Sequence, residues 1–124
     1  MDVALYDQVG GEGFFARLVE HFYARVHDDP TLRAMYPEDL GDSKRHLTLF
    51  LVQYWGGPRD YENERGHPRL RMRHAPFRVT KSARDAWLSA MTHALDEMKD
   101  ELSEDQYAEL LDYFTMAANQ LRNV

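Results

Sequence analysis

Histidine offers this sequence its widest choice of chemistry, because an imidazole can bind a metal or exchange protons near neutral pH. The 124 residues include six histidines and no cysteine, so disulfides, thiolate-bound metals and thiol nucleophiles are excluded. The HExxH and CxxC spacings of zinc sites are absent, as are the GxSxG, P-loop and GxGxxG motifs. Any special chemistry is therefore expected at single histidines.

Four of the six histidines have ordinary structural explanations. His21 and His93 lie away from the apolar face of their expected helices. His27 lies beside aspartates at a helix end, where the helix dipole favours a cation. His67 precedes a proline in a turn. Two histidines are left as candidates for a functional imidazole.

These two candidates are His46 and His74. His46 lies on an expected apolar helix and could flank an interior site. His74 follows Leu70 by four residues, so one helical turn would bring both side chains to one face. Pro76 would end this turn, and Phe77 would add apolar surface. The local pattern alone favours a structural role for His74.

Helices must position these side chains, because apolar residues recur with helical spacing and no stretch alternates as a strand would. The expected helices cover 12–27, 43–55 and 81–99, with a short helix that starts at Pro30 and a last helix opened by the capping pair Ser103 and Gln106. Asp42 or Ser43 is expected to cap the helix at 43–55. The sequence therefore predicts an all-α chain.

Residues 56–82 interrupt this regular pattern and differ from the rest in charge. They hold seven of the fifteen basic residues and three acidic ones, a balance of +4 in a chain whose net charge is −6. The remaining residues therefore carry −10. Because a long irregular stretch in a small domain is often functional, we interpret this segment as a local anion site.

Several stretches together resemble one family, the group II truncated haemoglobins. The similarity runs from about Tyr6 to Leu121, and the run GHPRLRMRHAPF is its most specific part. The matching stretches are Phe22-Tyr23, Tyr36–Leu40, Gln53–Pro58, Gly66–Phe77 and Asp85–Leu88. The resemblance implies one truncated globin domain over residues 1–124. Its fold would be a two-over-two helical sandwich around one b-type haem.

The resemblance also implies roles for individual residues. His74 matches the proximal iron ligand, whereas Tyr23, Tyr36 and Trp87 match distal hydrogen-bond donors. A neutral imidazole suits ferrous iron and leaves its sixth position open for a gas. By pattern alone, Trp87 is central in its apolar stripe, and this position favours ordinary core packing.

Other positions are expected around the cofactor. Leu47 matches the apolar position over the distal face, and Ser43 matches the position where many globins carry a distal histidine. Ser43 could open a ligand route from solvent or merely cap its helix. Haem propionates need cations or donors, for which Arg73 is the first candidate and Tyr61 and His46 follow. Apolar contacts with the haem are expected from Phe50 and Phe77.

These expectations lead to a functional hypothesis: reversible binding of O2, CO or NO, with redox chemistry or sensing rather than bulk O2 delivery. NO dioxygenase or peroxidase-like activity is a further option, and a reductase is a candidate partner. A dedicated haem peroxidase is the alternative, with His46 as its acid–base group. A non-haem helical module that uses residues 56–82 to bind nucleic acid or an acidic protein is disfavoured by the net charge of −6.

The location and assembly of the protein are predicted only coarsely. The start of the sequence, MDVALYDQVGG, lacks the basic and apolar regions of a signal peptide, and no apolar run reaches the roughly 18 residues of a membrane span. We therefore expect a cytoplasmic protein without membrane or nucleic-acid partners. Both a monomer and a homodimer are compatible with the sequence.

Overall fold

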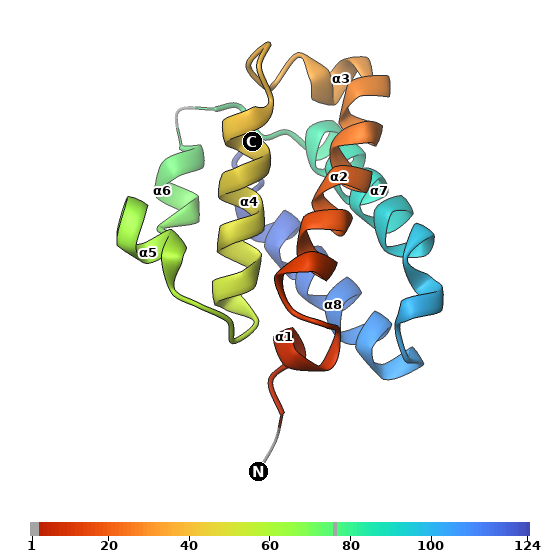
Figure 1. The fold of residues 1–124 in the computed structure, drawn as a ribbon. Coiled ribbons are helices and arrows are strands. Elements are labelled where there is room, and N and C mark those ends of the chain that lie inside the picture. Colours follow the sequence, from red (N-terminus) through yellow and green to blue (C-terminus); the bar gives the residue numbers. More distant parts are fainter. Residues whose placement is uncertain (1–2, 76) are drawn as a thin grey trace.

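The computed structural model describes residues 3–75 and 77–124, and its regular elements in these ranges are all helical (Figure 1). Pro76, which was expected to end the turn after His74, lies outside the described residues. The helices are α1 Leu5–Gln8, α2 Glu12–Asp28, α3 Pro30–Arg33, α4 Gly41–Tyr54, α5 Asp60–Arg65, α6 Leu70–His74, α7 Lys81–Glu97, the 3-10 turn η1 Lys99–Glu101 and α8 Glu104–Leu121.

Two antiparallel helix pairs make up the body of the molecule, α2 with α4 and α7 with α8, and α2 also packs across α7 (Figure 1). This arrangement confirms the predicted all-α, two-over-two sandwich. The core between the pairs is apolar, because α2 places Phe14, Phe15, Leu18 and Phe22 at helical spacing on one face and buries all four. In the described part of the chain, no helix is both long and apolar enough to cross a membrane.

The ends of the long helices test the cap predictions. The capping box at Ser103 is confirmed, since its hydroxyl accepts from Gln106 N at 3.1 Å and the Gln106 side chain accepts from Ser103 N at 2.9 Å. The predicted cap of α4 at Asp42 or Ser43 is wrong. The helix starts earlier, at Gly41, whose N–H donates to the Asp39 carboxylate at 2.8 Å. Ser43 is therefore inside the helix and available for another contact.

Residues 56–82 are less irregular than predicted, because they contain α5, α6 and the start of α7. Periodicity could not reveal the two short helices, since the described structure buries only Tyr61 of α5 and no residue of α6. Neither helix carries an apolar stripe. Predicted boundaries elsewhere were close, and α7 ends at Glu97 rather than at 99 because the chain tightens there into η1.

The turn after α4 provides a test of the packing. A Cβ atom added to Gly57 would lie 2.7 Å from ring carbons of Tyr6 and from Val52 Cγ1. We expect Gly57→Ala to lower the free energy of unfolding by about 1–3 kcal/mol, because the crowded neighbours must move. The matched control is Gly13→Ala on α2, where the nearest atom is the flexible Arg17 Nη1 at 3.4 Å. The control should be neutral or stabilising. Equal urea midpoints for the two variants would contradict the packing described.

Candidate functional site

His74 is the last residue of α6, and its imidazole has one fixed hydrogen bond. Nδ1 lies 2.7 Å from the carbonyl oxygen of Leu70, one turn earlier in the helix. A carbonyl can only accept, so Nδ1 carries the proton and Nε2 carries the lone pair. Among the described residues Nε2 has no hydrogen-bond partner. The predicted pairing of Leu70 and His74 on one helical turn is confirmed, and it leaves a half-buried, oriented imidazole donor atom.

Three polar aromatic side chains from α2, α7 and the turn after α3 lie close together. Tyr23 of α2 packs edge-on against Tyr36, which follows α3, with ring centroids 5.5 Å apart. Trp87 of α7 lies 5.6 Å from the ring of Phe22, the neighbour of Tyr23. Tyr23 is buried, whereas Tyr36 and Trp87 are half-buried. The fold therefore gathers the three predicted distal donors into one cluster.

The hydroxyl groups of this cluster stay protonated. Burial raises the pKa of Tyr36 to about 12, although hydrogen bonding with Tyr23 and Trp87 offsets part of that shift. Burial also raises the pKa of Tyr23 well above its usual range, as does its interaction with Tyr36, while a hydrogen bond with Ser43 acts in the opposite direction. Ser43 thus belongs to the cluster instead of capping α4. At neutral pH each phenol is a hydrogen-bond donor.

Helix α4 presents apolar side chains that the core covers only in part. Leu51 and Val52 are buried, but Leu47 and Phe50 are half-buried at the edge of the core. The ring of Phe50 contacts Tyr61 of α5 at a centroid distance of 5.6 Å. The two predicted positions on α4 therefore offer apolar surface to something beyond the protein core.

A cluster of polar side chains joins α4 to α5. His46 Nδ1 accepts from Arg65 Nη1 at 3.2 Å, and the Arg65 guanidinium lies 5.9 Å from the centre of the Tyr61 ring. Arg45 and Glu64 form a second bridge between the two helices. Burial, followed by the charge of Arg65, lowers the pKa of His46. His46 is therefore neutral near pH 7 and tied to α5.

Arg73 holds the short helix α6 to the loop before it. Its Nε donates to the carbonyl of Pro68 at 2.7 Å, and its Nη2 donates to the carbonyl of Arg65 at 2.8 Å. A guanidinium has five N–H groups, so three remain for an anion. The sequence predicted a cation at this position but not its contacts with the backbone.

Two contributors to this region were missed at the sequence level. Arg65 joins His46, Tyr61 and Arg73, and Asn123 bonds the segment that follows His74. Neither residue lies on an apolar stripe, and their partners are far away in the sequence, so no local pattern could mark them. A pattern of charge could have marked Arg65, which belongs to the basic segment 56–82.

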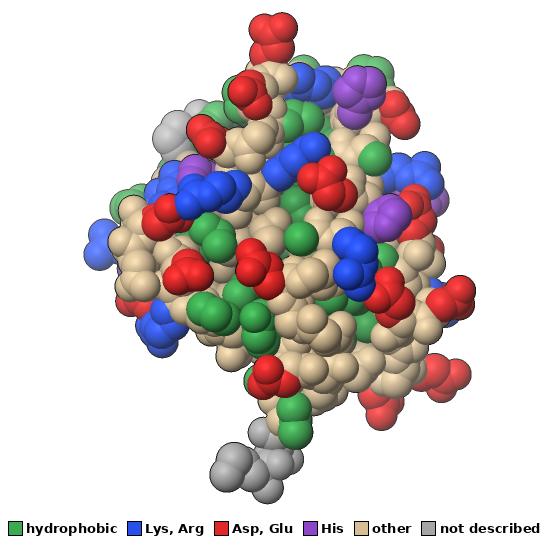
Figure 2. Space-filling view, viewed as in Figure 1, with side chains coloured by type: hydrophobic (Ala, Val, Ile, Leu, Met, Phe, Trp, Pro, Cys, Tyr) green, Lys and Arg blue, Asp and Glu red, His purple; other side chains and the backbone are tan. Residues whose placement is uncertain are grey.

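Charged side chains of both signs cover the visible face of the molecule and do not form one broad basic patch (Figure 2). Pairing explains part of this mixture, since Arg45 bonds Glu64 across α4 and α5, and Arg59 bonds Glu62 within the segment. The acids Glu62 and Glu64 are already counted in the balance of +4 at 56–82, so these pairs disperse the positive charge of that segment but do not remove its excess. Mixed charge of this kind gives a weak electrostatic footprint for nucleic acid.

Comparison with known proteins gives a consistent result. The family model described as bacterial-like globin matches residues 4–120. The group 2 truncated hemoglobin YjbI of Bacillus subtilis is 45% identical over 95 residues, which cover 77% of this chain and 71% of that protein.

Solved structures agree with this sequence similarity. The hemoglobin of Chloroflexus aurantiacus is 49% identical, with a TM-score of 0.94 over 99% of this chain and 100% of that one. A truncated oxygen-avid haemoglobin from Bacillus subtilis is 39% identical, with a TM-score of 0.91 over 98% of this chain and 100% of that one.

The raised pKa of Tyr36 predicts a loss of stability in alkali. Unfolded tyrosine ionises near pH 10, whereas Tyr36 in the folded protein ionises near 12. Its contribution is therefore complete below pH 10 and is lost as the pH rises through 12, by about 1.4 kcal/mol per pH unit in that window. We expect urea unfolding from pH 9 to 11 to show a smaller loss of stability in Tyr36→Phe. Identical pH dependence in both proteins would contradict the burial of this phenol.

Proposed function

This chain belongs to the bacterial-like globins, as a group II truncated haemoglobin, and from that membership we propose that His74 holds the iron of a b-type haem. The family binds haem and small gaseous ligands. When bound, haem supplies an iron centre with one open position for O2, CO or NO. We propose that residues 1–124 act as one such globin unit.

The donor set of this chain fits a haem. The observation that carries the proposal is the 2.7 Å bond from His74 Nδ1 to the Leu70 carbonyl, because it fixes the tautomer and directs the lone pair of Nε2 outward from α6. Leu47 and Phe50 supply half-buried apolar surface, as a largely apolar macrocycle requires. The ring centroids of Phe77 and His74 are 6.4 Å apart, and the Phe77 side chain is exposed, so it is free to cover the cofactor.

Three side chains would stabilise a gas bound to the haem. Tyr23, Tyr36 and Trp87 are hydrogen-bond donors, and the raised pKa of Tyr36 keeps its proton in place across the physiological range. A donor that bonds a partly charged acceptor is worth about 1.5–3 kcal/mol. Each could therefore slow ligand escape by roughly 10- to 150-fold. Ser43 would orient the Tyr23 hydroxyl through their hydrogen bond.

The propionates would lie against the polar cluster of α4, α5 and α6. Arg73 has N–H groups left after its two bonds to backbone carbonyls, and it is the strongest cation candidate. Tyr61 and the neutral His46 would add donors beside Arg65. This assignment gives the basic segment 56–82 a partner of opposite charge.

Slow release suits reactive or sensing roles better than bulk delivery. Donors from three elements would retain O2 long enough for it to react, and the related Bacillus subtilis protein is described as oxygen-avid. We therefore propose that bound haem would supply redox chemistry of O2 or NO, with a reductase as the partner that would provide the electrons.

The iron ligand is tested by cavity rescue. His74→Gly should abolish stable haem uptake because it removes the only proposed protein ligand, and added imidazole should restore the Soret band by filling the vacated space. His46→Ala is the comparison variant: it removes one proposed propionate donor but no iron ligand, so it should still take up haem. The account fails if His46→Ala loses haem while His74→Gly keeps it.

The distal donors are tested by the rate of O2 dissociation, measured by stopped flow. Trp87→Phe and Tyr36→Phe each remove one N–H or O–H group while retaining most of the ring volume. We expect each to speed O2 dissociation by roughly tenfold or more. Tyr107→Phe is the control, because that hydroxyl bonds Asp96 away from the cluster. Unchanged rates in both distal variants would rule out the donor account.

A further inference from the structure

The helix that carries His74 cannot maintain its position by itself. α6 has five residues, and none of these described residues is fully buried. It begins after Arg69, whose φ of 44° is left-handed and whose side chain caps nothing. Helices of this length are unstable in isolation, because few hydrogen bonds offset the cost of nucleation. Contacts from outside α6 must therefore fix the imidazole.

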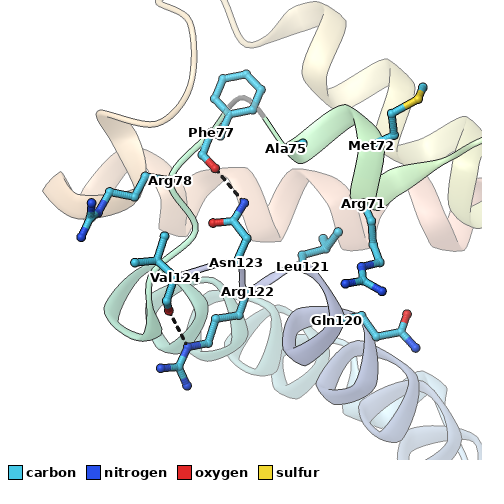
Figure 3. A pocket seen from close by; sticks show the side chains of 10 residues that line it. All are labelled: Arg71, Met72, Ala75, Phe77, Arg78, Gln120, Leu121, Arg122, Asn123 and Val124. Carbon is cyan, nitrogen blue, oxygen red and sulfur yellow. Dashed lines mark hydrogen bonds between the residues drawn. The ribbon is translucent and has the colours of Figure 1, made fainter.

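Asn123, which follows α8, supplies such contacts to the segment after α6. Its backbone N–H donates to the carbonyl of Val79 at 3.0 Å, and its side-chain Oδ1 accepts from Val79 N at 2.9 Å. Its Nδ2 donates to the carbonyl of Phe77 at 2.9 Å (Figure 3), and also reaches the carbonyl of His74 at 3.4 Å. The side-chain amide of Asn123 thus bonds the last residue of α6 and two residues of the segment after it, all more than forty positions away in the sequence.

These bonds bear directly on the backbone of His74. The His74 carbonyl is at the C-terminal end of α6, where carbonyls lack partners within the helix. It accepts from Phe77 N at 2.9 Å and from Asn123 Nδ2. The imidazole is meanwhile held by the Leu70 carbonyl. Asn123 therefore fixes the backbone on one side of His74, and Leu70 fixes its ring on the other.

We propose that Asn123 is a positioning residue for the iron ligand. Its Nδ2 donors hold the Phe77 and His74 carbonyls, and through them they set the direction of the His74 imidazole. This inference rests on the proposed role of His74 but adds a control from the far end of the chain. Arg73 anchors the start of the same helix, so α6 is held at both ends by side-chain amide or guanidinium groups bonded to carbonyls.

Two variants separate the donor role from other effects. Asn123→Ala removes all side-chain contacts, whereas Asn123→Asp keeps an acceptor for Val79 N and removes the Nδ2 donors. Asn119→Ala is the matched control, because Asn119 also lies near the end of α8 but accepts from Arg84 of α7. All are prepared as full-length, haem-loaded proteins.

Three readouts are expected to change together. In both Asn123 variants, the iron–histidine stretching band of the ferrous protein should shift, and haem transfer to an excess of apomyoglobin should accelerate by roughly tenfold. Amide hydrogen exchange at Phe77 should also rise, and this readout does not depend on haem reactivity. Asn119→Ala should match the wild type in all three.

The outcomes distinguish this inference from the proposed function. If the wild-type chain takes up no haem, the proposed function fails. If haem binds normally but Asn123→Asp behaves like the wild type, the donor role of Asn123 is overturned while the role of His74 stands. An iron–histidine band that is unchanged in Asn123→Ala would likewise overturn the positioning role.

Discussion

The hydrogen bond from His74 Nδ1 to the carbonyl of Leu70 is the interaction on which the proposed site depends. It selects the tautomer that has a free lone pair on Nε2, and it forms because α6 makes one helical turn between these two residues. That turn buries little apolar surface, so polar contacts from Arg73 and Asn123 hold it. The geometry of the donor atom is thus set by hydrogen bonds to backbone carbonyls rather than by core packing.

The cluster of proposed distal donors must combine burial of aromatic rings with hydrogen bonding of their polar atoms. Tyr23, Tyr36 and Trp87 pack like core residues, but their polar atoms must keep partners because an unsatisfied buried donor is costly. Tyr36 interacts with both Tyr23 and Trp87, and Tyr23 also interacts with Ser43, at the meeting point of α2, the turn after α3, and α7. The same burial that raises the phenol pKa values keeps the donors protonated. Stability and the proposed ligand chemistry therefore rely on the same contacts.

Most of the fold could be predicted from the sequence, because α2, α7 and α8 bury continuous apolar stripes and periodicity detects them. The spacing of Ser103 and Gln106 likewise predicted the capping box at the start of α8. The helix α5 was not predicted, and α6 was expected only as the single turn from Leu70 to His74, since polar contacts with other segments stabilise these short helices and no apolar stripe marks them. Local pattern also could not assign a role to His74; that role came from the specific run 66–77. No sequence pattern marked Asn123, because its partners are backbone N–H and carbonyl groups, which nearly every residue carries.

A crystal structure of the haem-loaded protein would test most directly whether His74 is the ligand of the iron. The account predicts that His74 Nε2 is the protein ligand of the iron, with Nδ1 still bonded to the Leu70 carbonyl. It also predicts that the polar atoms of Tyr36 and Trp87 face the opposite side of the haem. Iron bound through His46, or through no histidine, would contradict it.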